Sequence, residues 1–168
     1  MCIRDSSRIF HWLSATVLII QIPLGMYLVD MDFSEKRLTI ENIHVAVGIS
    51  IFYLTVLRLI YKAFNPTPKL NNSIFPGQKI IAKLNHVFLY ISILMITISG
   101  ALKKLYNGEE LDMFFFNLEI QDNFDLAEIF YEIHILGNYT LIALISLHIF
   151  AVLIHKILFK ENLLKRIL

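Results

Sequence analysis

The segment from Tyr131 to Phe159 most limits what this chain can fold into, because its length and composition are those of a membrane-spanning helix. It has no charged residue between Ile133 and Leu153, and about 20 consecutive apolar residues are enough to cross a membrane. Yet the same segment carries His134 and His148. Ionisable side chains inside a membrane span are costly, and these two histidines are therefore candidates for a functional site.

The spacing of the two histidines indicates what they can do together. They are 14 residues apart, which at about 100° per residue returns to within about 40° of the same helix face. A rise of about 1.5 Å per residue separates them by roughly 21 Å along the helix. One helix face therefore holds one imidazole near each side of the membrane. This suits two metal centres at different depths, if other helices supply a second imidazole at each depth.

Three further apolar segments are also long enough to cross a membrane. Of the 168 residues, 57% are hydrophobic and only 17% are charged, which is typical of membrane proteins with several spans. The expected spans are Ile9–Val29, Ile43–Tyr61, Leu84–Leu102 and Ile133–Leu158. We therefore expect an all-α membrane protein, a bundle of four transmembrane helices. Residues 1–6 (MCIRDS) look like a translated sequencing-library scar, so a single transmembrane domain is expected over residues 7–168.

The distribution of charge predicts the orientation of the spans. Of the 15 Lys and Arg residues, 11 lie at the N-terminus, in the middle loop and in the C-terminal tail, with Arg58 at a helix end. Acidic residues follow the opposite pattern, with 2 on that side and 12 in the other two loops. Because cations near span ends stay on the cytoplasmic side, both termini are expected to be cytoplasmic.

The six histidines fall at two depths of the expected bundle. The outer level contains two of them, His44 and His134. The inner level contains four, His11, His86, His148 and His155.

Two neutral imidazoles from different helices at one depth are suited to bis-histidine haem, which needs one nitrogen ligand on each face of the iron. Zinc would need three or four ligands, with help from cysteine or carboxylate groups that neither level supplies. The histidines alone leave copper open. We predict that His44 and His134 form the outer axial pair. The inner pair is expected to be His11 and His148, which lie well inside their spans, and the sequence leaves open whether His86 replaces His11.

Other residues are given supporting roles by their spacing. Gly48 and Gly137 follow His44 and His134 on the same helix faces, where a porphyrin would need space. Arg58 is 14 residues after His44 and is expected at the inner level, neutralising a haem propionate.

The two remaining inner histidines, His86 and His155, have no haem to bind in this scheme. We predict that they contact a quinone and deliver protons to it. In the acidic outer loop, the aromatic residues Phe114, Phe115 and Phe116 are expected to rest at the membrane surface.

Five segments surround the six histidines, namely RIFHWL around His11, NIHVAVGISI around His44, NHVFLY around His86, and EIHILGN and LISLHIFAVLIHK around the last three histidines. Together with the basic PTP loop, they resemble the bacterial cytochrome b-561 family, whose best-described type is the membrane superoxide oxidase. The resemblance extends from about Ser7 to Leu168. It implies four transmembrane helices, two haem b groups on the same axial pairs, and electron exchange with quinone in a bacterial inner membrane.

We therefore expect a dihaem b-type cytochrome, a superoxide:ubiquinone oxidoreductase-like enzyme that passes electrons from the outer face to ubiquinone. Two histidines on each iron leave no open position, which favours electron transfer over oxygen binding. Membrane lipid, quinone and superoxide or a redox partner are the expected partners, and nucleic acid is not one. The cations available to attract superoxide are Lys36, Arg37, Lys103 and Lys104.

Two alternatives stay open at this point. The same plan is similar to the cytochrome b subunits of hydrogenases and formate dehydrogenases, which relay electrons between a bound oxidoreductase and quinone. The acidic loop Asn107–Glu132 would then be the docking surface. In the other alternative the protein is a haem-free membrane scaffold, and its histidines serve only in packing.

Overall fold

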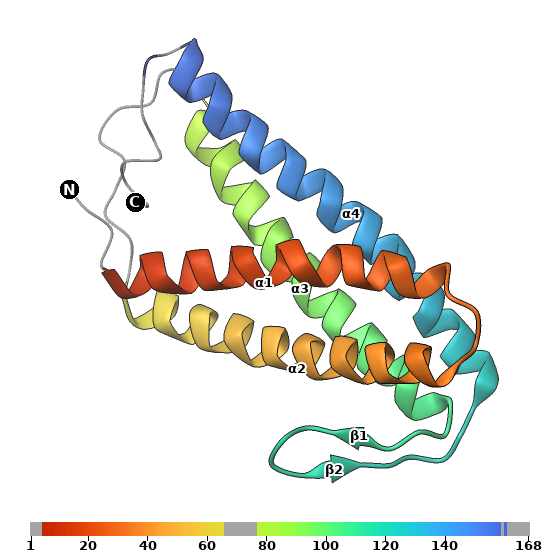
Figure 1. Ribbon diagram of the computed structural model, residues 1–168. Coiled ribbons are helices and arrows are strands. Elements are labelled where there is room, and N and C mark those ends of the chain that lie inside the picture. The colour runs from red at the N-terminus through yellow and green to blue at the C-terminus, as the bar shows by residue number, and fades with distance from the viewer. Residues whose placement is uncertain (1–4, 66–76, 159, 161–168) are drawn as a thin grey trace.

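The computed structural model describes residues 5–65, 77–158 and 160, which form four long helices and one short β-hairpin (Figure 1). The helices are α1 (Asp5–Val29), α2 (Glu35–Phe64), α3 (Gln78–Tyr106) and α4 (Phe124–Ile157). All four are long and apolar enough to cross a membrane. The predicted all-α class with four spans is therefore confirmed.

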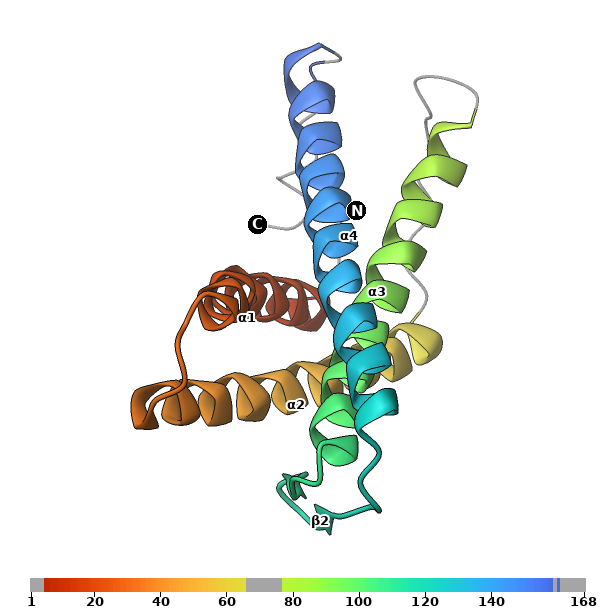
Figure 2. The same ribbon diagram turned by 90° about the vertical axis from the view of Figure 1, so that its right-hand side faces the viewer.

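The helices form two hairpins that cross one another. α1 packs along α2, α3 packs along α4, and the two hairpins meet where α2 contacts α3. Figures 1 and 2 show the α1–α2 pair lying across the α3–α4 pair at a steep angle. The space between the two hairpins is therefore bounded by side chains from all four helices, and the functional residues lie there.

Polar caps extend two of the helices beyond their apolar spans. Asn123 accepts a hydrogen bond from the backbone N–H of Leu126 at 3.1 Å, and α4 starts at Phe124 rather than at the apolar boundary. Ser34 likewise accepts from the backbone N–H of Arg37 at 3.2 Å at the start of α2. Each cap satisfies a backbone donor that the first helical turn leaves unpaired.

Buried side chains are few and lie in two small clusters. One joins α2 to the C-terminal end of α3 through Ile49, Leu105 and Leu111. The other joins α2, α3 and α4 near their middles through Ile51, Ile93 and Leu141. Most other large apolar side chains point outward, as expected for helices whose surroundings are lipid rather than water.

The loop between α3 and α4 folds back onto α2. Its strands β1 (Leu111–Asp112) and β2 (Asn117–Leu118) pair antiparallel. Leu111 is 1% exposed and belongs to the buried cluster with Ile49 and Leu105. The Tyr53 hydroxyl donates a hydrogen bond to the Met113 carbonyl at 3.1 Å. At the tip, Phe115 is 83% exposed, and the contact of these aromatics with a membrane surface stays a prediction.

Parts of the sequence interpretation fall outside the structure. Of the suspected scar, residues 1–4 lie outside the described residues, whereas Asp5 and Ser6 begin α1. The centre of the middle loop, residues 66–76, and the tail, residues 161–168, also lie outside them. The cytoplasmic placement of both termini stays a prediction.

Candidate functional site

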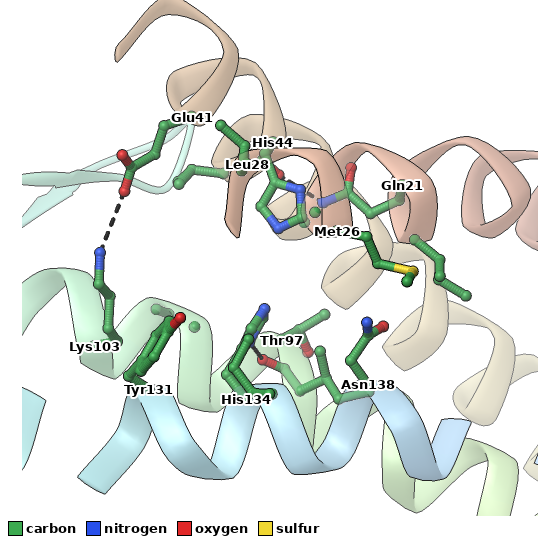
Figure 3. Close-up of a pocket in the computed structure, with 18 of the residues that line it drawn as sticks. Gln21, Met26, Leu28, Glu41, His44, Thr97, Lys103, Tyr131, His134 and Asn138 are labelled. Atoms are coloured by element: carbon green, nitrogen blue, oxygen red, sulfur yellow. Dashed lines mark hydrogen bonds and ion pairs between the residues drawn. The ribbon is translucent and has the colours of Figure 1, made fainter. Parts of the chain in front are cut away.

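The predicted outer pair, His44 of α2 and His134 of α4, meets in the space between the two hairpins (Figure 3). The ring centres are 6.2 Å apart and the ring planes lie at 76° to each other. Two imidazoles bound to opposite faces of one metal ion, each through a bond of about 2 Å, have ring centres about 6 Å apart. The separation of the two rings therefore fits an axial pair.

The two rings differ in the hydrogen bonding of their Nδ1 atoms. The Nδ1 of His134 is 2.9 Å from the Ile96 carbonyl, and since a carbonyl can only accept, this nitrogen carries the proton. The Nε2 of His134 therefore keeps its lone pair, which is what a metal requires. The Nδ1 of His44 is buried without a hydrogen-bond partner among the described residues. A buried polar atom without a partner is unusual, and it indicates that another group completes this site.

A glycine on a neighbouring helix leaves space for each ring, and we call each of these two positions a glycine seat. A Cβ on Gly25 of α1 would lie 2.9 Å from Cε1 of His44. A Cβ on Gly100 of α3 would lie 2.9 Å from both Cε1 and Nδ1 of His134. Any larger residue would displace the rings, and therefore each seat requires the glycine that is present.

Gly48 and Gly137, which the sequence predicted to leave space for a porphyrin, do not contact the histidine rings. A Cβ on Gly137 would approach Ile96 to 2.8 Å, so this glycine allows α3 and α4 to pack closely. A Cβ on Gly48 would be 3.7 Å from the Gln21 amide nitrogen, which is an ordinary contact. Neither faces its ligand ring, because a ring that reaches across to the next helix needs space on that helix and not on its own.

A cavity of about 460 Å³ surrounds the outer pair, within the range of about 300–1,000 Å³ that is usual for cofactor and ligand sites. All four helices contribute to it. Its lining is mainly apolar, with polar groups such as Gln21, Thr97 and Asn138 (Figure 3) and with six charged residues, Asp30, Arg37, Glu41, Lys103, Lys104 and Glu132. The paired imidazoles, the glycine seats and this apolar cavity together fit a flat, largely apolar group held by two axial histidines.

Three of the four predicted outer cations also line this cavity, namely Arg37, Lys103 and Lys104. Each of the two lysines is held by a carboxylate. Lys103 is 3.2 Å from Glu41, and Lys104 is 2.5 Å from Glu109. These ion pairs weaken the positive field that would attract an anion from solution.

The pKa of Glu109 shows the same pairing from the acidic side. Partial burial acts to raise it, but hydrogen bonds from Lys104 and Asn107 and the positive charge of Lys104 hold the pKa below its ordinary value. Glu109 is therefore ionised at neutral pH and remains a partner for Lys104.

At the inner level, His11 of α1 and His148 of α4 are also brought together. Their ring centres are 6.4 Å apart, close to the separation of about 6 Å expected for an axial pair. His86 of α3 is nearer to His148, with ring centres 5.1 Å apart and planes at 84°. That edge-on contact is too short to leave room for a metal ion between the rings. The geometry therefore favours His11 over His86 as the partner of His148.

Arg58 lies beside His11, and its predicted contact with a haem propionate stays a prediction. Its Nη2 donates a hydrogen bond to Nδ1 of His11 at 3.2 Å, and its guanidinium lies 5.3 Å from the centre of the Tyr90 ring. An arginine can only donate, so the proton of His11 resides on Nε2 in this arrangement. For His11 to offer Nε2 to a metal, Arg58 must release Nδ1, and a carboxylate such as a propionate is the stronger partner for it.

The structure does not bring the two proposed quinone histidines together. His86 is exposed and lies 2.7 Å, through Nδ1, from the Ala82 carbonyl. His155 is buried, with Nε2 3.1 Å from the Gln78 amide nitrogen. Gln78 precedes His86 by eight residues, or about 12 Å along α3. His86 therefore joins the inner histidine cluster, and His155 lies about two turns beyond it.

Four residues of the two levels were not singled out from the sequence, namely Gln21, Gly25, Asn85 and Gly100. Gln21 had a visible signal, because it is an amide within an otherwise apolar span. Its Nε2 donates to the His44 carbonyl at 2.8 Å. Asn85 lies next to His148, and adjacency to His86 in the sequence gave no hint of that contact. Within the part of the chain that the structure describes, no three histidine, cysteine or acidic side chains converge as metal ligands.

Comparison with known proteins gives a consistent result. The family described as prokaryotic cytochrome b561 matches residues 4–168. The chain is 26% identical over 166 residues to cytochrome b561 homolog 2 of Escherichia coli (strain K12), an alignment that covers 96% of this chain and 88% of the relative. It is 28% identical over 162 residues to the probable superoxide oxidase CybB of Yersinia pestis, covering 94% of this chain and 90% of the relative.

Proposed function

Because the chain belongs to the prokaryotic cytochrome b561 family, we propose that it is a dihaem b-type cytochrome that transfers electrons from superoxide at the outer face to ubiquinone. Membership in the family carries membrane electron transfer and haem b with it, and makes the chain a multi-pass bacterial membrane protein. The two haems, the inner membrane, the donor and the acceptor belong to the proposal.

The observation that carries the proposal is the repeated separation of the paired rings. His44 with His134, and His11 with His148, have ring centres 6.2 and 6.4 Å apart. Each pair includes one histidine of α4, and these two, His134 and His148, are 14 residues apart along that helix. A haem-free scaffold would have no reason to repeat this separation at two depths.

The protein's own groups have distinct tasks in this scheme. Haem, when bound, supplies the one-electron chemistry. The four histidines would hold the haem groups, the apolar part of the cavity lining would pack against the outer one, and Arg58 would neutralise a propionate. Two superoxide anions each lose one electron to become O₂, and one ubiquinone takes the two electrons and two protons to become ubiquinol. His86, which is exposed at the inner level, and His155 would deliver those protons.

Superoxide as the donor rests on two lines of support. One relative carries the name probable superoxide oxidase, and Arg37, Lys103 and Lys104 line the outer cavity. The carboxylates that pair with the two lysines favour the alternative, in which the protein relays electrons between a partner oxidoreductase and quinone. In that case the acidic outer loop would bind a basic surface of the partner.

Haem content tests the first part of the proposal. Purified protein should contain two haems per chain, with His134→Ala and His148→Ala each losing one of them. His155→Ala is the matched control, because it removes a histidine of α4 that lies outside both pairs, and it should retain two haems. Colourless protein, or two haems retained after both ligand substitutions, would contradict the proposal.

Rapid mixing separates the two possible donors. Superoxide is mixed rapidly with oxidised protein in ubiquinone-containing vesicles. It should reduce the haems on the timescale of the rapid-mixing measurement and generate ubiquinol. Lys103→Gln and Lys104→Gln together should slow this step and reduce its dependence on ionic strength. If superoxide leaves the haems oxidised while the protein co-purifies with a stoichiometric oxidoreductase, the relay function is the correct one.

A further inference from the structure

Asn85 of α3 forms a polar contact with His148 of α4 and has no role in the function proposed above. Its amide nitrogen Nδ2 lies 3.4 Å from Nδ1 of His148. Its amide oxygen Oδ1 is buried without a hydrogen-bond partner among the described residues. An unpaired buried carbonyl oxygen costs about 1–3 kcal/mol, and such an atom calls for an explanation.

The proton on His148 decides whether this histidine can bind a metal. A neutral imidazole carries one N–H and one lone pair. If the Asn85 nitrogen donates to Nδ1, the proton must reside on Nε2, and that nitrogen is then blocked. If Nδ1 carries the proton instead, it needs an acceptor, and Nε2 keeps the lone pair that an axial ligand requires.

Half a turn of the Asn85 amide removes the conflict over the His148 proton. The nitrogen and oxygen of a carboxamide occupy equivalent positions, and the surrounding hydrogen bonds select between them. In the turned orientation Oδ1 faces Nδ1 of His148 and gains a partner, while Nδ2 takes the buried position that Oδ1 leaves. The same change fixes the His148 proton on Nδ1 and leaves Nε2 available.

The outer level provides a precedent within this chain. The Nδ1 of His134 donates to the Ile96 carbonyl at 2.9 Å, and Ile96 lies on α3, as Asn85 does. At both depths, therefore, α3 lies where it can offer an oxygen to the Nδ1 of an α4 histidine. The backbone supplies that oxygen at the outer level, and a side chain would supply it at the inner level.

We propose that Asn85 is a positioning residue for the inner haem, whose amide oxygen accepts the Nδ1–H of His148. The proposal rests on the axial role of His148 proposed above. An acceptor on Nδ1 makes the imidazole a stronger donor to iron and so favours the ferric state. Because the accepting oxygen belongs to a side chain, substitution of Asn85 can change its effect on the haem potential without altering the backbone.

Redox titration of the purified dihaem protein, followed by haem absorbance, tests this role. Asn85→Leu keeps the size of the side chain and removes the acceptor, so the inner haem should become easier to reduce. A tenfold change in the ferric-to-ferrous equilibrium would raise its midpoint potential by about 59 mV. Asn85→Asp supplies a stronger acceptor with the shape of asparagine and should lower the midpoint. The outer haem should be unaffected in both variants.

Gln78→Leu is the matched control, because Gln78 of α3 also forms an amide–histidine contact with α4, at His155. It should leave both midpoints unchanged. The inference fails if Asn85→Leu and Asn85→Asp shift the inner midpoint in the same direction, leave it unchanged, or shift it no more than Gln78→Leu does. Loss of the inner haem in His148→Ala, together with unmoved midpoints in the Asn85 variants, would refute this inference alone. Retention of two haems in His148→Ala would refute the axial role itself.

Discussion

Replacing Gly100 by alanine should damage the outer site although it adds only one methyl group. The new Cβ would lie 2.9 Å from both Cε1 and Nδ1 of His134, and the ring cannot easily turn aside because Nδ1 is bonded to the Ile96 carbonyl. Inserting a methyl group into a filled space costs about 1–3 kcal/mol, and losing that hydrogen bond costs about 0.5–1.5 kcal/mol more.

The sum indicates a loss of about 1.5–4.5 kcal/mol at the outer site. Since 1.4 kcal/mol corresponds to about a tenfold change in an equilibrium constant, the affinity for the outer haem should fall by about tenfold or more. Haem-to-protein ratios after dialysis against a haem-binding competitor, and the midpoint of the outer haem, measure this loss. The inner haem provides an internal reference in the same sample.

Two other glycines make the comparison sharper. Gly25→Ala creates the same 2.9 Å approach to His44, but the Nδ1 of His44 has no partner to lose among the described residues, so the effect should be smaller. Gly48→Ala makes only an ordinary contact at 3.7 Å and should be neutral or slightly stabilising, because alanine favours a helix. If Gly100→Ala bound the outer haem as well as Gly48→Ala does, the argument that the glycine seats the ring would be wrong.

Three further perturbations have expected outcomes. Arg58→Leu removes a cation beside His11 and should lower the midpoint of the inner haem, measured by redox titration, while haem is retained; an unchanged midpoint would contradict the assigned position. The folded-state pKa of Glu109 is below its ordinary value of 4.5, so its stabilising contribution is complete above that pH and is lost as the pH falls through the lower folded value; thermal midpoints measured against pH should show this loss in the wild type and not in Glu109→Gln. Tyr53→Phe removes the hydrogen bond to Met113 and should loosen the β-hairpin by about 0.5–1.5 kcal/mol, seen as faster amide exchange in the hairpin with unchanged exchange in α4.

The sequence alone determined the membrane class and the four helices, and it predicted which histidines share a level. These follow from local properties: apolar length sets a span, and the position of a residue along a span sets its depth. The same reasoning chose His44 with His134, and His11 with His148, and the structure places both pairs at a separation that suits axial ligands.

Only the tertiary structure decided what surrounds each ring. Which face of one helix meets which face of another depends on how the two hairpins cross, and this crossing is a property of all four helices packed together. For that reason Gly25 and Gly100 seat the rings instead of Gly48 and Gly137. The same dependence brings Asn85 to His148 across 63 residues of sequence and separates His86 from His155. Depth can be read along one helix, but a neighbour on another helix exists only after the helices have packed.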